Sequence, residues 1–233
     1  MNKKIKGFLA AGIMSAVMSQ NAVAQENDVD PWEGFNRAMF SFNDTLDTIA
    51  LKPLTKGYKA IMPDAAERGV SNFFDNLADV GTMINNLLQA KFENAAQDLA
   101  RVTFNSTFGL AGFIDVATPM GIEKHNEDFG QTLGYWGVES GPYLVLPFFG
   151  PSSVRDGVGK IPDSMVDPVS HLDDTGARNA LYLTRVIDSR SRLLETEKLI
   201  SGDKYTFIRD AYLQTREFDV LDGNLDNYDD SNF

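Results

Sequence analysis

Apolar residues recur at intervals of three or four over most of the chain, which is the spacing of one helix face rather than of a strand. This pattern predicts helices over residues 30–52, 64–88, 92–108, 177–200 and 203–218. The first should begin at Asp30-Pro31, a capping residue followed by proline, and end before Pro53. The second is expected to divide in two between residues 76 and 81.

The pattern changes in the middle of the chain. Ten glycines between residues 109 and 159 separate short apolar pieces, so long regular elements are not expected there. Residues 140–154 form an uncharged, strongly apolar run that contains three prolines and two glycines. Because these residues disrupt a spanning helix, the run must be an irregular loop that is buried in the protein or placed against lipid.

The N-terminus has the composition of a secretory signal peptide. Three lysines precede an apolar stretch over residues 7–18, and Ala22-Val23-Ala24 is a small-residue cleavage site ahead of Gln25. We therefore expect residues 1–24 to be removed. Residues 25–218 should form one helical domain, followed by an acidic, flexible tail over residues 219–233.

Charge and composition exclude several classes of function. The chain carries a formal charge of −12, and cleavage after Ala24 would remove three lysines and leave −15. Such an acidic surface repels phosphate backbones, so a nucleic-acid partner is not expected. The sequence contains no cysteine, which excludes thiolate catalysis, disulfides and cysteine-based metal sites.

Catalytic and metal-binding signatures are sparse. The two histidines, His125 and His171, are far apart and have no familiar ligand spacing. No serine lies in a nucleophile-elbow motif, and the aspartates near the C-terminus depart from a calcium loop. The aromatic residues between Trp136 and Phe149 surround the uncharged loop, which is typical of a membrane interface. The sequence therefore favours a lipid-facing protein over an enzyme, without a cofactor or metal.

Six blocks that run in order along the chain resemble the MlaA/VacJ family. They are Asp30-Pro-Trp-Glu-Gly-Phe-Asn-Arg37, Ser71-Asn-Phe-Phe-Asp-Asn-Leu77, Gly112-Phe-Ile-Asp-Val-Ala117, Glu127-Asp-Phe-Gly-Gln-Thr-Leu-Gly134, Gly141-Pro-Tyr with Pro147 to Asp156, and Tyr205-x3-Arg209-x2-Tyr212-x3-Arg216. The resemblance implies an all-α fold, with a ring-like arrangement of amphipathic helices around a central amphipathic channel. The irregular glycine- and proline-rich segment would belong to this ring.

The resemblance also implies a function. Family members are outer-membrane components that remove mislocalised phospholipids from the outer leaflet and pass them to a periplasmic carrier, which maintains lipid asymmetry. A trimeric porin is the usual membrane partner, and no cofactor is implied. Many members carry a lipidated cysteine, whereas this sequence has none. We therefore expect a non-lipidated protein on the periplasmic side of the outer membrane, held by its amphipathic helices or a porin.

The resemblance assigns a channel or gate to a small set of positions. They are Phe42, Asn43, Gly137, Gly141, Pro142 and Tyr143. Two other functions stay open at this point. A periplasmic lipid hydrolase would need His125 together with a nearby serine or aspartate, and a porin-associated scaffold without transport would need no lipid path.

Overall fold

The computed structural model describes residues 29–224, so the predicted signal peptide and most of the acidic tail lie outside the described residues. The helical fold class is confirmed, with one two-stranded sheet in this part of the chain. The elements are α2 (Glu33–Leu46), η1 (Asp47–Leu51), α3 (Lys52–Ile61), α4 (Asp64–Leu88), α5 (Phe92–Thr107), η2 (Thr118–Met120), α6 (Phe129–Tyr135), β1 (Tyr143–Leu146), β2 (Gly150–Ser153), α7 (Val154–Val166), η3 (Pro168–His171), α8 (Thr175–Leu193), η4 (Thr196–Leu199) and α9 (Lys204–Val220).

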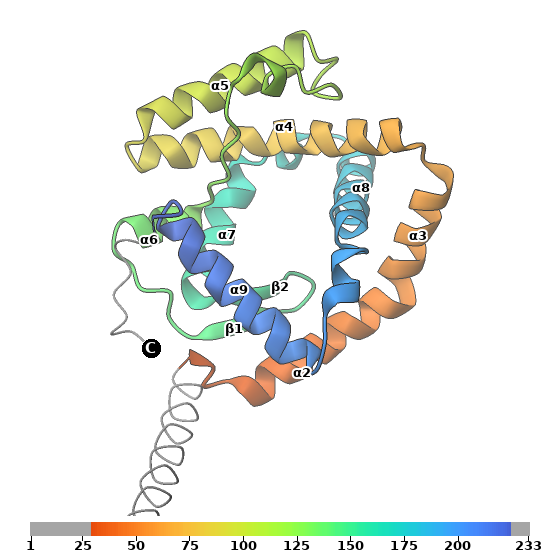
Figure 1. Cartoon of the computed structure of the whole chain (residues 1–233), viewed down its shortest axis with the longest axis vertical. Helices are drawn as coiled ribbons and strands as arrows, with labels where there is room; N and C mark the ends of the chain where they lie inside the picture. The colour runs from red at the N-terminus through yellow and green to blue at the C-terminus, as the bar shows by residue number, and fades with distance from the viewer. Residues whose placement is uncertain (1–28, 225–233) are drawn as a thin grey trace, which may run out of the picture.

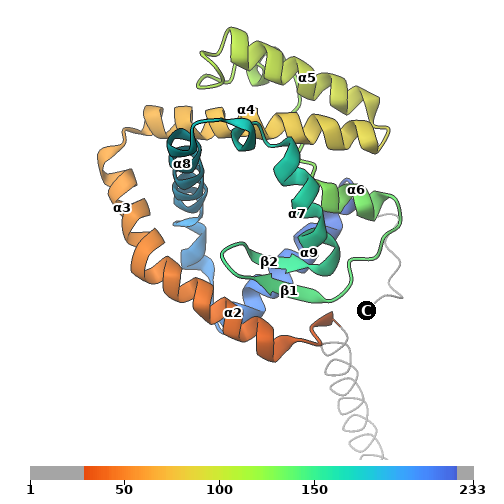
Figure 2. The same ribbon diagram turned by 180° about the vertical axis from the view of Figure 1, so that it is seen from behind.

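The helices are arranged as a frame. Helices α2, α3, α4 and α7 lie along its sides, and α5 packs on the outer side of α4 (Figures 1 and 2). Helices α8 and α9 and the β1–β2 hairpin fall within or across the outline in both views. No helix among residues 29–224 is long and apolar enough to cross a membrane.

The first predicted helix differs from expectation at both ends. Asp30 does not cap it, because the helix begins at Glu33 and the Asp30 carboxylate is buried against Asn36 and Tyr205. The helix also continues past Pro53 into α3 through the π-helical segment η1. The wider π turn accommodates the proline ring, which would otherwise clash with the carbonyl four residues earlier.

Two further helix boundaries required correction. Helix α4 runs unbroken from Asp64 to Leu88, since residues 76–81 keep helical geometry and Gly81 leaves room beside Val166. Helix α8 ends at Leu193 rather than at residue 200, and the separate turn η4 follows it. The middle of the chain contains only short elements until α7, as its glycines predicted.

Burial in this fold is reversed relative to an ordinary soluble protein. Seven apolar residues are buried in the described part of the chain, against 21 polar or charged ones, while 32 large apolar side chains are exposed. In α5, Asp98 and Arg101 are buried whereas Phe92 and Leu99 are 68% and 53% exposed. Soluble proteins rarely expose apolar surface on this scale unless another molecule or a membrane covers it.

One small apolar core lies around strand β1. Tyr143, Val145 and Tyr205 are buried together, and Phe40 packs its ring edge-on against Tyr205. The strand pairs antiparallel with β2, with Tyr143 opposite Ser153 and Leu146 opposite Gly150. This core joins α2, the hairpin and α9, so it fixes the base of the hairpin inside the frame.

Candidate functional site

Two asparagine side chains of α2 take the place of a third strand beside β1. Asn36 donates to the carbonyl of Tyr143 at 3.0 Å and accepts from the amide of Val145 at 2.8 Å. Asn43 donates to the carbonyl of Leu146 at 2.9 Å and accepts from the amide of Phe148 at 2.8 Å. Each side-chain amide therefore satisfies one carbonyl and one N–H group along the open edge of the strand.

The spacing of the two asparagines explains how a helix can do this. Asn36 and Asn43 are two turns apart on α2, which corresponds to about 10 Å along the helix axis. Their targets are centred on Leu144 and Pro147, three residues apart, which is also about 10 Å along an extended strand. The two repeats match, so the hairpin is held at its base by Asn36 and at its tip by Asn43, which together form the α2 clamp.

The tip of the hairpin is apolar and exposed. Phe148 and Phe149 are 77% and 72% exposed, and the Phe148 ring packs edge-on against Phe42 at a centroid distance of 5.4 Å. Phe148 has a positive φ of 67°, a conformation that costs a side-chain-bearing residue about 1–2 kcal/mol. The contacts with Phe42 and Asn43 offset this cost, and together these residues define the tip site: Phe42, Asn43, Phe148 and Phe149.

The other predicted site residues lie away from the tip. Gly137 follows α6 with a φ of 85°, and nothing lies within 4 Å of the position where its Cβ would be. Gly141 has a φ of 67° and leads into the hairpin base, where the Pro142 carbonyl accepts from the amide of Val154 at 3.2 Å. Tyr143 is fully buried in the core. The structure thus brings Phe42 and Asn43 to the tip, and places Gly141, Pro142 and Tyr143 at the base.

An ion-pair network fixes the helix that follows the hairpin. The Asp156 carboxylate on α7 accepts from Arg216 at 2.8 and 3.0 Å, from the Tyr212 hydroxyl at 2.5 Å and from Arg155 at 2.9 Å. Arg216 also binds Asp128 through two hydrogen bonds of 2.5 and 2.7 Å. Burial acts to raise the pKa of Asp156, but the hydrogen bonds from Arg216 and Tyr212 hold this pKa at about 2.

Each of the two histidines has a hydrogen-bond partner in its own part of the fold. The Nδ1 atom of His125 lies 2.9 Å from the buried carboxylate of Asp98, which also accepts from Asn86 at 2.7 Å. The Nε2 atom of His171 is 2.7 Å from the carbonyl of Met165. Residues 29–224 contain no cluster of side chains that could hold a metal ion. His125 thus links the 122–127 segment to the α4–α5 pair.

Sequence reasoning missed the role of Asn36 and of the hairpin tip. Asn36 lies 107 residues from its partner Tyr143, so no local pattern could connect them. The only signal was that Asn36 falls within the first block of the family resemblance. Phe148 belonged to the uncharged run, but the run alone did not say which of its aromatic residues would be exposed.

Comparison with known proteins gives consistent matches over most of the chain. The sequence matches the family model described as MlaA lipoprotein over residues 28–219. The Escherichia coli K12 protein named intermembrane phospholipid transport system lipoprotein MlaA is 35% identical over 207 residues, covering 86% of this chain and 82% of that protein. Its Haemophilus influenzae counterpart is 32% identical, covering 91% and 92%.

A solved structure has the same fold. It superimposes with a TM-score of 0.72 at 34% sequence identity, covering 82% of this chain and 98% of the other. The study that describes it concerns the structural basis for maintenance of bacterial outer membrane lipid asymmetry. The hairpin, the α2 clamp and the exposed apolar faces therefore sit on a fold shared along nearly the whole described chain. The chain belongs to the MlaA lipoprotein family.

Proposed function

We propose that this protein is the outer-membrane component of a phospholipid transport system and removes mislocalised phospholipids from the outer leaflet. The observation that carries the proposal is its relationship to proteins named as lipoproteins of an intermembrane phospholipid transport system. Passage of a lipid needs shielding of its acyl chains, since exposing each CH₂ group to water costs about 0.8 kcal/mol. It requires no cofactor.

The reversed burial supports this proposal. Exposed apolar faces on α5 and at the hairpin tip suit contact with acyl chains, whereas the polar residues between α4 and α5 hold the helices together. Short amphipathic helices can lie in one leaflet without crossing the bilayer. Irregular backbone is tolerated at membrane depth where protein or water covers it. We infer that the frame encloses an amphipathic channel between the outer leaflet and the periplasm.

We assign the gate of this channel to the tip site. The hairpin lies within the outline of the frame in both views, and Phe42 with Asn43 anchors its exposed end (Figures 1 and 2). Gly137 and Gly141 flank the segment that leads into the hairpin, and both have positive φ angles. They act as hinges in this proposal, because glycine reaches these angles without strain.

The partners follow from the same proposal. A trimeric porin holds the protein in the outer membrane, and a periplasmic lipid carrier accepts the phospholipid. The relatives are named as lipoproteins, yet the present sequence has no cysteine to acylate. The membrane contact therefore rests on the exposed apolar faces and on the porin.

The proposal is tested by labelling phospholipid on the surface of cells that lack the protein. Such cells should accumulate surface phospholipid and become sensitive to detergent with chelator, and the wild-type gene should reverse both effects. Normal surface lipid in the deletion strain would contradict transport and favour a scaffold, for which copurification with a porin without bound phospholipid would be the sign.

The same assay separates transport from hydrolysis. His125→Gln keeps a donor for Asp98, so this variant combined with His171→Gln should fold and restore surface lipid to the wild-type level. A folded double variant that fails to complement, together with lysolipid or fatty acid in wild-type cells, would favour the hydrolase.

The hinge is tested by Gly141→Ala and Gly137→Ala. Both substitutions impose a positive φ on a residue with a Cβ, so clearance of surface phospholipid should fall while helix content is retained. Gly34→Ala is the matched control, because Gly34 is helical and has nothing within 4 Å of its Cβ position. Unchanged clearance in both hinge variants would exclude the hinge.

A further inference from the structure

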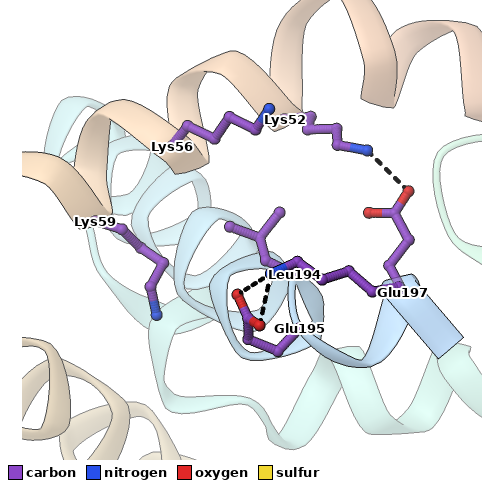
Figure 3. Close-up of a pocket in the computed structure, with 7 residues that line it drawn as sticks. Lys52, Lys56, Lys59, Leu194, Glu195 and Glu197 are labelled. Atoms are coloured by element: carbon purple, nitrogen blue, oxygen red, sulfur yellow. Dashed lines mark hydrogen bonds and ion pairs between the residues drawn. The ribbon is translucent and has the colours of Figure 1, made fainter.

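A cavity lies between α3 and the turn that joins α8 to η4. Its volume is about 510 Å³. Figure 3 shows side chains from both elements converging on it, with a lysine and a glutamate joined across the gap. The residues that line it are Lys52, Lys56, Lys59, Leu194, Glu195, Glu197 and Lys198.

The concentration of lysine at this cavity is unusual for so acidic a chain. The sequence has eight lysines beyond residue 24, and four of them line this one cavity, although the whole chain carries a net charge of −12. Lys52, Lys56 and Lys59 are spaced four and three residues apart on α3, so they share one face of that helix. Four lysines against two glutamates leave the lining with an excess of positive charge.

The lysines differ in how they are paired. Lys52 binds Glu197 at 2.9 Å, Lys59 binds Glu67 at 3.0 Å, and Lys198 binds Glu195 at 2.7 Å. Among the residues that the structure describes, Lys56 has no carboxylate partner, and its side chain is exposed. The Lys198–Glu195 pair is solvent-exposed, with side-chain exposures of 69% and 79%, so Lys198 can turn toward an anion at little cost.

One apolar side chain accompanies the charges, because Leu194 also lines the cavity. Lysine stems lie readily along apolar surface while their ammonium groups stay in the polar layer. A ligand with an anionic group next to acyl chains fits this combination better than a free anion does.

We propose that this cavity binds the phosphodiester of a phospholipid head group, with Lys56 as its main contact. The inference rests on the proposed function for the choice of a lipid, and it adds a head-group site outside the hairpin gate. The phosphate oxygens would accept from Lys56 and Lys198, while Leu194 lies along the glycerol and the first acyl carbons.

The test measures binding of dihexanoylphosphatidylglycerol, below its micelle concentration and at low salt, to the purified full chain by calorimetry. Lys56→Gln should weaken binding about tenfold, since it removes one charge-assisted contact. Lys160→Gln is the matched control, because Lys160 is exposed on α7 and has no ion pair within residues 29–224; it should change binding less than twofold. Glutamine is a good helix former, so helix content checks that both variants fold.

Two further probes identify what is recognised. Dihexanoylglycerol, which lacks the phosphate, should bind Lys56→Gln and wild type equally. Inorganic phosphate should not displace dihexanoylphosphatidylglycerol when the two are present at the same concentration. Displacement would mean a site for free phosphate and would overturn the proposal. Equal binding of the phospholipid by Lys56→Gln and wild type would overturn it as well. If this in vitro test fails while the wild-type gene still clears surface phospholipid from cells, only the head-group site is lost.

Discussion

Two regions of the molecule each bury an aspartate beside an arginine, and the two aspartates behave in opposite ways. In the α4–α5 arm, Asp79 contacts Arg101 through a single long hydrogen bond of 3.3 Å. Burial raises the pKa of Asp79 to about 6, and the charges of Lys124 and Arg101 offset only part of this effect. Around the hairpin, Asp156 accepts four hydrogen bonds from Arg216, Tyr212 and Arg155, and its pKa falls to about 2.

The contrast shows what a buried carboxylate needs in this fold. The cost of removing a carboxylate from water is recovered only when several donors surround it. The hairpin region meets that condition, and its ion pairs join the start of α6 to α7 and α9. The α4–α5 arm meets it less fully and exposes its apolar side chains instead. We therefore infer that the hairpin region is stabilised from within, whereas the arm depends on its surroundings.

The largest expected effect comes from replacing each of the two aspartates by asparagine. Asp156→Asn should lower the free energy of unfolding by about 2–3 kcal/mol at pH 7, because charge-assisted hydrogen bonds are lost. Asp79→Asn should instead raise it by about 1 kcal/mol, because burial destabilises the ionised form of Asp79 and Arg101 keeps its ion pair with Asp115. Denaturant unfolding in a nonionic detergent measures both variants, and the same sign for both would contradict the comparison.

The pH dependence of stability should separate the two aspartates again, by up to about 2–3 kcal/mol each. The folded pKa of Asp79, about 6, lies above the unfolded value of about 3.9, so its protonation should increase stability as the pH falls from about 6 to about 4. The folded pKa of Asp156 lies below the unfolded value, so its contribution is present above about pH 4 and is lost toward pH 2. Unfolding curves of wild type, Asp79→Asn and Asp156→Asn across this range test the two slopes; parallel curves would contradict them.

Replacing an apolar residue by serine should affect membrane binding in the α4–α5 arm and stability in the hairpin region. Phe92→Ser in α5 should weaken binding to phospholipid vesicles about tenfold with little loss of stability in detergent, since Phe92 is 68% exposed. Phe40→Ser should lower stability in detergent and leave vesicle binding nearly unchanged, because Phe40 packs on Tyr205 in the small core. Glu93→Ser is the exposed polar control on α5. Vesicle binding that is indifferent to Phe92 would mean that lipid does not cover this face.

The same contrast explains what could be predicted from the sequence. The apolar spacing located the helices, because it depends only on which residues share a face. It could not say which face would be buried, since the medium outside the protein decides that; in α5, Asp98 and Arg101 turned out to be buried and Leu99 exposed. The passage of a helix through Pro53 also escaped prediction, because a π turn leaves no composition signal.

The candidate site was predictable only through the family resemblance. That resemblance named Phe42 and Asn43 as candidates, and the structure adds the backbone groups that Asn43 binds. Asn36 and Phe148 depend on contacts more than 100 residues apart in sequence, which a single sequence does not contain. The roles of Gly137 and Gly141 as hinges remain predictions, supported by their positive φ angles.

The smallest expected effect concerns the tip of the hairpin. Asn43→Ala removes both hydrogen bonds to the tip, whereas Asn36 and the apolar core continue to hold the base. The tip should therefore open locally, and exchange of the Phe148 amide with solvent should become about fivefold faster, which corresponds to about 1 kcal/mol. Global stability should change less than this. Ser41→Ala is the matched control on α2, because within residues 29–224 the Ser41 hydroxyl donates to the carbonyl of Arg37 in its own helix and not to the hairpin. Unfolding of the whole protein in Asn43→Ala would mean that the tip is part of the core, and an unchanged Phe148 amide would mean that the hairpin holds its shape without the clamp.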